Sequence, residues 1–337
     1  SLSYRLPSPP LAVILGFYLF LLLLLLKPRF RGQRPVTWLL FLAFFLILVT
    51  YPFKPGTDEL TVTVIDTGQG ESQVVEFPGG RLMVIDAGGF LQSNFDPGES
   101  LVSPFLWSGG YKKIDYLVSS HLHPDHAGGL PALARNFKIG EYLFTENYVA
   151  NALNQEIQSA LSKKVKRTRI TPGLKLWPAA EIEVRFFYPD ETALVSFQPG
   201  NDRSAVIRIR QGNISFLFSG DITGQVENYL IGQKEIKEEL KATVLKIPHH
   251  GSRSSSTAAF LQAVSPAIAV ATCGRHNVYG FPAEEVILRL KERRVKFYRT
   301  DLDGAIEFKT DGRYLSLRTA RSEAALVFEA TGQPYPD

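Results

Sequence analysis

The sequence has little cysteine or methionine, and its first 57 residues contain no acidic side chain. The one cysteine among 337 residues, Cys273, excludes both an intrachain disulfide framework and a cysteine-rich zinc module. The one methionine is Met83 and the chain begins Ser-Leu-Ser-Tyr, so we expect a piece of a longer protein. Hydrophobic residues make up 45% and charged residues 21%, which excludes a mainly disordered chain.

Charge is unevenly distributed along the chain. Residues 1–57 carry six of the 37 basic side chains and none of the 33 acidic ones. The remaining residues therefore carry 31 basic and 33 acidic side chains, a net charge of −2, although the whole chain is at +4. Because this larger part has no overall positive field, nucleic-acid binding there requires a local basic patch or a metal.

Two uncharged apolar runs, at residues 11–26 and 36–53, lie near the beginning of the chain. A bilayer needs about 17–25 apolar residues, so the first run is short and the second is long enough. We expect a two-helix transmembrane hairpin within residues 1–57, with a basic loop at 27–35; the alternatives are a signal peptide or a buried hairpin. Short basic loops stay cytoplasmic, which predicts a multi-pass protein of the cell membrane, in contact with lipid, with an extracytoplasmic domain from residue 58.

Short β-type runs alternate with helical stretches after residue 58. We expect strands at 60–66, 73–77, 82–86, 114–119, 182–188, 204–210, 214–219, 244–247, 267–271, 295–298, 305–309 and 314–317. Helical patterns lie at 224–231, 256–264 and 283–291. Such a succession is typical of an α/β (α+β) domain with two sheets and outer helices. We place this domain at residues 58–320, followed by a C-terminal tail at 321–337 without a clear core pattern.

The strongest chemical signal directly follows one expected strand, in the sequence Ser-Ser-His-Leu-His-Pro-Asp-His-Ala-Gly-Gly. Four potential metal ligands lie there within six residues: His121, His123, Asp125 and His126. The first two can point in one direction, while the last two face a second position around a turn. Imidazole nitrogen and carboxylate oxygen together suit Zn²⁺, Mn²⁺ or Fe²⁺.

Further candidate ligands follow later strands. Asp221 comes after an apolar strand, where its carboxylate could bridge two cations. His249 and His250 follow the next strand, and the alternative for them is a structural hydrogen-bonded pair. His276 lies after a further strand, and an exposed loop position is an equally good interpretation of it.

Taken together, these motifs resemble the metallo-β-lactamase superfamily, whose fold is an αβ/βα sandwich with a dinuclear site at one edge of its sheets. The opening Asp66-Thr-Gly-Gln69-Gly-Glu resembles the ComEC branch of that superfamily. The segments 201–204, 248–252 and 299–304 fit the same branch. ComEC-like proteins are polytopic DNA-uptake channels with such a domain attached, which agrees with the expected membrane hairpin.

The resemblance implies two divalent metal ions, Mn²⁺ or Zn²⁺. The first would be held by His121, His123 and Asp221, and the second by Asp125, His126, Asp221 and His250. Asp125 would also orient the nucleophile, and His249 would contact the substrate phosphate or the leaving group. Residues expected to contact substrate or to support the ligands are Asp66, Gln69, Asp86, Asn201, Ser204, Arg253 and His276.

The chain departs from the family pattern in two places. Many members have a further histidine between the histidine motif and the bridging aspartate, but residues 127–220 contain none. The first metal position is thus short of a ligand. The family also often has His-Pro where this chain has Phe281-Pro282, so His276 is a possible substitute.

The expected function is a metal-dependent deoxyribonuclease domain of a DNA-uptake protein, which hydrolyses the strand that is not imported. Its partners would be single-stranded DNA, the channel formed by the rest of the polypeptide, and other competence proteins. Residues 163–169 hold five basic side chains, which fit either a phosphate-tracking strip or a solvated face. Tyr279 and Phe281 could stack on bases, with core packing as the simpler interpretation. The alternatives are a hydrolase of a phosphorylcholine ester or lactone, and a non-catalytic DNA-guiding module.

Overall fold

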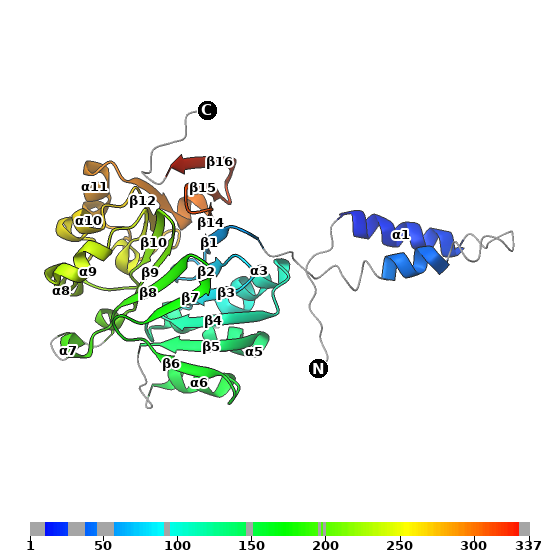
Figure 1. Ribbon diagram of the computed structural model, residues 1–337, viewed down its shortest axis with the longest axis horizontal. Helices are drawn as coiled ribbons and strands as arrows, with labels where there is room; N and C mark the ends of the chain where they lie inside the picture. The colour runs from blue at the N-terminus through cyan, green and yellow to red at the C-terminus, as the bar shows by residue number, and fades with distance from the viewer. Residues whose placement is uncertain are drawn as a thin grey trace. The chain divides into compact units, whose positions relative to one another are not determined.

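The computed structural model describes residues 11–25, 38–45, 57–90, 95–145, 151–194, 197 and 200–329 (Figure 1). The chain divides into two compact units, one of residues 1–55 with 104–112 and one of residues 56–103 with 113–337. In the first unit, helix α1 (Leu11–Leu25) contacts the helical residues 38–45, and the rings of Phe20 and Phe44 stack at 5.8 Å between centroids.

The expected transmembrane hairpin falls only partly within the described residues. Residue 26, the loop 27–35, residues 36–37 and residues 46–53 lie outside them. Among the helices that the structure does describe, none combines the length and the apolar character needed to cross a membrane.

Two mixed β-sheets form the framework of the second unit. The nine-stranded sheet has the order β16-β15-β14-β1-β2-β3-β4-β5-β6, and the seven-stranded sheet has the order β13-β12-β11-β10-β9-β8-β7. The neighbours from β3 to β6 and from β10 to β13 are parallel, and the other pairs are antiparallel.

The strands of the larger sheet are β1 (Leu60–Val64), β2 (Gln73–Glu76), β3 (Leu82–Ile85), β4 (Lys113–Ser119), β5 (Lys138–Phe144), β6 (Lys166–Arg169), β14 (Ile306–Thr310), β15 (Tyr314–Thr319) and β16 (Ser322–Glu329). Those of the smaller sheet are β7 (Lys175–Ala179), β8 (Ile182–Tyr188), β9 (Val206–Gln211), β10 (Ile214–Phe218), β11 (Val244–Lys246), β12 (Ile268–Ala271) and β13 (Lys296–Arg299).

The helices are α3 (Ser103–Ser108), α4 (Pro124–Ala127), α5 (Leu130–Asn136), α6 (Ala152–Ala160), α7 (Glu191–Leu194), α8 (Gly224–Gly232), α9 (Lys234–Glu239), α10 (Ala258–Val264), α11 (Glu284–Glu292) and α12 (Thr300–Asp303). Three further helical turns are η1 (Gly98–Val102), η2 (Asn201–Arg203) and η3 (Pro248–Gly251).

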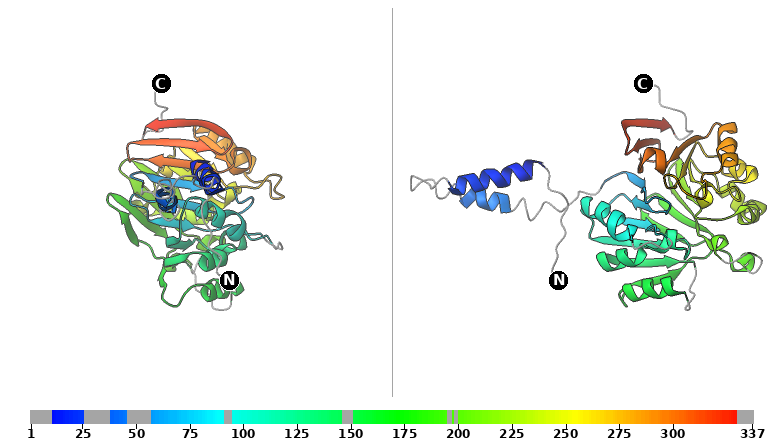
Figure 2. Two further views of the ribbon diagram at one scale, coloured as in Figure 1. Left: turned by 90° about the vertical axis from the view of Figure 1, so that its right-hand side faces the viewer. Right: turned by 180° about the vertical axis from the view of Figure 1, so that it is seen from behind.

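The two sheets enclose the main core between them. Buried apolar side chains of both sheets form one cluster, in which the Phe216 ring of β10 meets the Phe308 ring of β14 at 5.7 Å. A second cluster packs α8, α10 and α11 against the outer face of the smaller sheet, and α5 contacts β5 of the larger sheet (Figures 1 and 2). The expected two-sheet α/β sandwich with outer helices is therefore confirmed.

The ends of the domain differ in detail from the sequence expectation. Residues 322–329, expected to belong to a tail, form β16, which pairs with β15 and buries Phe328; residues 330–337 lie outside the described part.

The basic run at 163–169 contains β6, a mostly exposed strand at the end of the larger sheet. In it Lys166 pairs with Glu141 at 2.9 Å and Arg167 donates to Gln158 at 2.7 Å, so part of its charge is already engaged.

Candidate metal centre

The candidate ligands all follow strands that belong to the parallel parts of the two sheets. His121 and His123 follow β4, and the adjoining helix α4 carries Asp125 and His126. Asp221 follows β10, whereas His249 and His250 lie in η3 after β11. Since the carboxyl ends of parallel strands share one edge of a sheet, this topology brings distant residues together.

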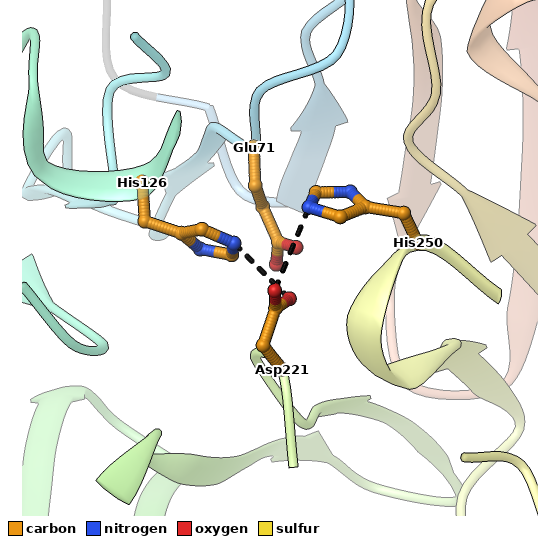
Figure 3. A group of neighbouring side chains, drawn as sticks. All are labelled: Glu71, His126, Asp221 and His250. Atoms are coloured by element: carbon orange, nitrogen blue, oxygen red, sulfur yellow. Dashed lines mark ion pairs between the residues drawn. The ribbon is translucent and has the colours of Figure 1, made fainter. Parts of the chain in front are cut away.

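Four buried side chains form the centre of the site: Glu71, His126, Asp221 and His250 (Figure 3). Each offers one ligand atom, and these atoms all lie within 4.8 Å of one another. Nε2 of His126 is 3.1 Å from Oδ1 of Asp221, and Nε2 of His250 is 3.7 Å from Oδ2 of Asp221. Because all four residues are at most 2% exposed, the group is screened from solvent.

Hydrogen bonds fix the orientation of two of these rings. Nδ1 of His126 lies 2.8 Å from Oδ2 of the buried Asp86, whose Oδ1 accepts from the Ser120 amide at 2.8 Å. Nδ1 of His250 donates to the carbonyl oxygen of Thr272 at 2.8 Å. Metal-binding histidines are held in the same way, with the second ring nitrogen left for the ion.

The donor atoms of this group fit a divalent cation. Nε2 of His121, His126 and His250 and Oδ1 of Asp221 are buried and lack a well-formed hydrogen bond among the described residues, although Nε2 of His126 lies 3.1 Å from Oδ1 of Asp221. Buried polar atoms are normally paired, so four convergent exceptions point to an ion that would satisfy them. Nitrogen and carboxylate oxygen donors are suitable for Zn²⁺ or Mn²⁺.

Burial and mutual charge shift the pKa values of the site residues strongly. Burial lowers the pKa of His121 well below its usual value, and the neighbouring His126 lowers it further. Burial alone would raise the pKa of Asp221, but His126 and His250 hold it well below its usual value. Burial alone would lower the pKa of His126, but Asp221 and Asp86 raise it well above its usual value. A cation bound here would therefore displace a proton from the His126 ring.

A more open group of predicted residues adjoins the buried one. The ring of His123 lies 4.7 Å from that of His121, between centroids. Oδ2 of Asp125 is 3.5 Å from Nε2 of His250, and Nε2 of His249 is 3.8 Å from Oδ2 of Asp221. The Asp125 and His249 side chains are 31% and 22% exposed, so they can contact a substrate as well as the buried group.

A polar cavity of about 590 Å³ opens beside His123. It is lined by His123, Asn201, Asp202, Thr223, Gly224, Gln225, Asn228 and Ser254. Nδ2 of Asn201 lies 3.2 Å from Nε2 of His249, which joins the cavity to the histidine pair. The cavity therefore gives a substrate access to the open side of the site.

The remaining predicted residues support the site or lie outside the ligand group. Ser204 accepts the backbone amide of Asp221 at 3.0 Å, and Gln69 accepts that of Gly274 at 3.1 Å. Asp66 accepts the amide of Gly68 at 3.2 Å, and burial raises its pKa. Arg253 and His276 are exposed, so the structure does not bring His276 into the ligand group as a replacement ligand.

Sequence reasoning missed Glu71 as a site residue and Lys246 as its partner. The Lys246 ammonium contacts the Glu71 carboxylate, and both side chains are 1% exposed. Gln73 also donates to Glu71, at 2.9 Å. The available signal was Lys246 itself, because a lysine that ends an apolar strand needs a buried acidic partner.

Three of these residues have a left-handed backbone conformation. Asp86, His249 and His250 have φ values of 57°, 50° and 53°. Residues other than glycine adopt this left-handed region at a cost, so the surroundings must impose it. Glu181, Ser265 and Arg294 adopt it away from the site, so this conformation supports the site only together with the geometry above. The amide of His249 donates to the Gly220 carbonyl at 3.0 Å, which helps to hold the turn.

Comparison with known proteins agrees with the site. A family model described as "Metallo-beta-lactamase superfamily" matches residues 61–275. The "ComE operon protein 3" of Bacillus subtilis (strain 168) is 27% identical over 319 residues, which cover 91% of this chain and 40% of the relative. The "Competence protein ComA" of Neisseria gonorrhoeae is 32% identical over 287 residues, covering 85% of this chain and 37% of the relative.

The chain therefore spans about two fifths of the length of these relatives. Among solved structures, the metallo-beta-lactamase fold protein YhfI from Bacillus subtilis matches with a TM-score of 0.47 and 13% identity. That match covers 72% of this chain and 95% of YhfI.

Proposed function

The chain belongs to the metallo-beta-lactamase superfamily, a superfamily of metal-dependent hydrolases, and on this basis we propose that its larger unit is the deoxyribonuclease domain of a DNA-uptake protein. It would hydrolyse the DNA strand that is not imported. The observation that carries this proposal is the convergence of unpaired buried donor atoms beside an open polar cavity. The choice of DNA is supported by the competence proteins among the relatives.

We assign two divalent cations to the site, Mn²⁺ or Zn²⁺. His121, His123 and Asp221 would hold one, and Asp125, His126, Asp221 and His250 the other. When bound, such cations supply a water of low pKa and stabilise the negative charge of a phosphodiester. The Glu71 carboxylate lies within the same group. Its two oxygens are engaged by Lys246 and Gln73, so we do not assign it as a ligand.

The open residues would handle the substrate. The Asp125 carboxylate accepts a hydrogen bond from the attacking water and so aims it at phosphorus. Burial lowers the pKa of His249, so a neutral ring faces the phosphate and donates a hydrogen bond to the leaving oxygen. Asn201, beside this ring, holds its orientation.

One observation favours a second function. None of the described residues that line the cavity is a lysine or an arginine. A polar pocket without basic side chains would suit a phosphorylcholine ester or a lactone better than a polyanion. A hydrolase of such a small substrate is therefore the second candidate.

The place of the domain in the whole protein follows from the first candidate. We propose that it lies on the outer face of the membrane, next to the uptake channel that the rest of the polypeptide forms. There it would meet single-stranded DNA together with other competence proteins.

A nuclease assay tests the proposal. The chain would be treated with chelator, supplied with Mn²⁺ or Zn²⁺, and given end-labelled single- and double-stranded DNA, a phosphorylcholine ester and a lactone. We expect metal-dependent cutting of single-stranded DNA that is lost in His123→Ala. Turnover of only the ester or lactone would select the second candidate, and no turnover by a folded, metal-loaded chain would contradict both.

A further inference from the structure

An aromatic stack leads from the metal centre to the surface. It lies in the loop after β12, where the Phe281 ring stacks on His250 with 6.5 Å between centroids and 18° between planes. The Tyr279 ring stacks in turn on Phe281, at 5.5 Å and 20°. Three nearly parallel rings therefore begin at a candidate metal ligand and end at a residue that is 56% exposed.

The loop that carries the stack is held by hydrogen bonds. Nδ2 of Asn277 donates to the carbonyls of Gly274 at 3.0 Å and Phe281 at 2.7 Å, and its Oδ1 accepts the Phe281 amide at 2.8 Å. Gln69 anchors the base of the loop by accepting the Gly274 amide. The rings are thus positioned before any ligand arrives, which lowers the entropic cost of binding.

Core packing does not explain these aromatic residues. Tyr279 is more than half exposed, and the adjacent Val278 is 91% exposed. Their side chains thus present apolar surface to solvent on a hydrogen-bonded loop whose Phe281 ring lies beside the candidate ligand His250. This apolar surface is accessible to a ligand that approaches the metal centre.

The chemistry of the stack selects the ligand. A flat, exposed ring in line with two others offers a π-face of the kind on which nucleobases stack, whatever their sequence. Arg275, in the same loop, is exposed and donates through Nε to the Asp301 carbonyl at 3.1 Å, which fixes a positive charge nearby. An apolar face next to a cation matches a base next to its phosphate.

We propose that Tyr279 and Phe281 form a stacking platform for an unpaired nucleobase beside the phosphodiester bond to be cut. This inference rests on the proposed nuclease function and names how the site recognises single strands. A base in a duplex is already stacked on its neighbours and cannot reach the platform without being extruded, so the platform favours single-stranded over double-stranded DNA.

Binding measurements on the full chain test the platform. The probe is a fluorescein-labelled, single-stranded oligothymidine, with binding followed by anisotropy in the presence of chelator so that no cleavage occurs. Tyr279→Ala is compared with Tyr279→Phe, which keeps the ring, and with Trp177→Ala, which removes a 60% exposed aromatic ring from β7. We expect Tyr279→Ala to weaken binding about fivefold or more, and the two controls to stay within about twofold of the wild type.

Abasic probes locate the base. Removing one base at a time should weaken wild-type binding at one position and leave Tyr279→Ala unaffected there. Two results would overturn the platform: wild-type DNA affinity in Tyr279→Ala, or an equal loss of affinity at every abasic position. In either case, DNA cleavage by the wild type would still support the proposed function. Absence of both DNA binding and DNA cleavage in the wild type would instead overturn the proposed function itself.

Discussion

The buried and the open halves of the site differ in how their side chains are held. In the buried half, Asp86 and the Thr272 carbonyl fix Nδ1 of His126 and of His250, and Nε2 of each ring faces the Asp221 carboxylate. In the open half, Asp125 and His249 are partly exposed and border the substrate side. The difference matches the two tasks that we propose, in which the buried half binds an ion and the open half acts on a substrate.

The largest effect is expected at the residue that the two halves share. Asp221→Asn removes the charge that lies between His126 and His250, so we expect loss of stoichiometric metal and of all turnover. Metal content measured by mass spectrometry after dialysis checks this, with the exposed Asp58→Asn as the control. Full metal content in Asp221→Asn would show that the buried half is not the binding site.

The next largest effect concerns stability. Lys246→Met leaves the Glu71 carboxylate buried without its partner, which should lower the free energy of unfolding by about 3–5 kcal/mol. Denaturant unfolding measures this, and the exposed Lys234→Met should change the value by less than about 0.5 kcal/mol. The double variant Glu71→Gln, Lys246→Met should recover much of the loss. If it is no more stable than Lys246→Met, the two side chains do not act as a pair.

The neighbouring residues His249 and His250 allow a direct comparison of the open and the buried halves of the site. His249→Gln should retain metal and lower kcat by about 10²- to 10⁴-fold, because it removes only a contact to the substrate. His250→Gln should lose metal as well. Parallel measurements of metal affinity and kcat distinguish the two variants, and a loss of metal in both would remove the division between the halves.

A smaller effect on metal affinity is expected at Asp86, which supports a candidate ligand through a hydrogen bond. Asp86→Asn weakens the hydrogen bond that orients His126, so metal affinity should fall about 10- to 100-fold while the ligands themselves remain. Isothermal titration of the chelated protein with Zn²⁺ measures the change. An unchanged affinity would mean that Asp86 has only a structural role.

The sequence predicted the site better than it predicted the edges of the fold. The spacing of His121 to His126, and the ends of apolar strands at Asp221 and His250, predicted residues that the structure brings close together, because such patterns are local. The sequence did not predict Glu71 as a site residue, because its place there depends on its ion pair with Lys246, which is 175 residues away in the chain. The sequence did not predict strand β6, because Lys-Arg-Thr-Arg has no alternation of apolar and polar residues. Only its pairing with β5 makes this segment a strand.

The sequence left the roles of Tyr279 and Phe281 open between base stacking and core packing. An aromatic residue after a strand usually packs in the core, but Tyr279 is 56% exposed in a loop that Asn277 holds by hydrogen bonds. A sequence shows which residues belong to the same loop. The packing of the whole domain decides which of those residues face solvent.

The most direct test of the metal site is anomalous X-ray scattering from crystals of the chain grown with Zn²⁺. We predict a peak about 2.0–2.2 Å from Nε2 of His126, a carboxylate oxygen of Asp221 and Nε2 of His250. A second peak should lie beside His121 and His123. A fully occupied zinc bound elsewhere, with this group left free of metal, would contradict the account.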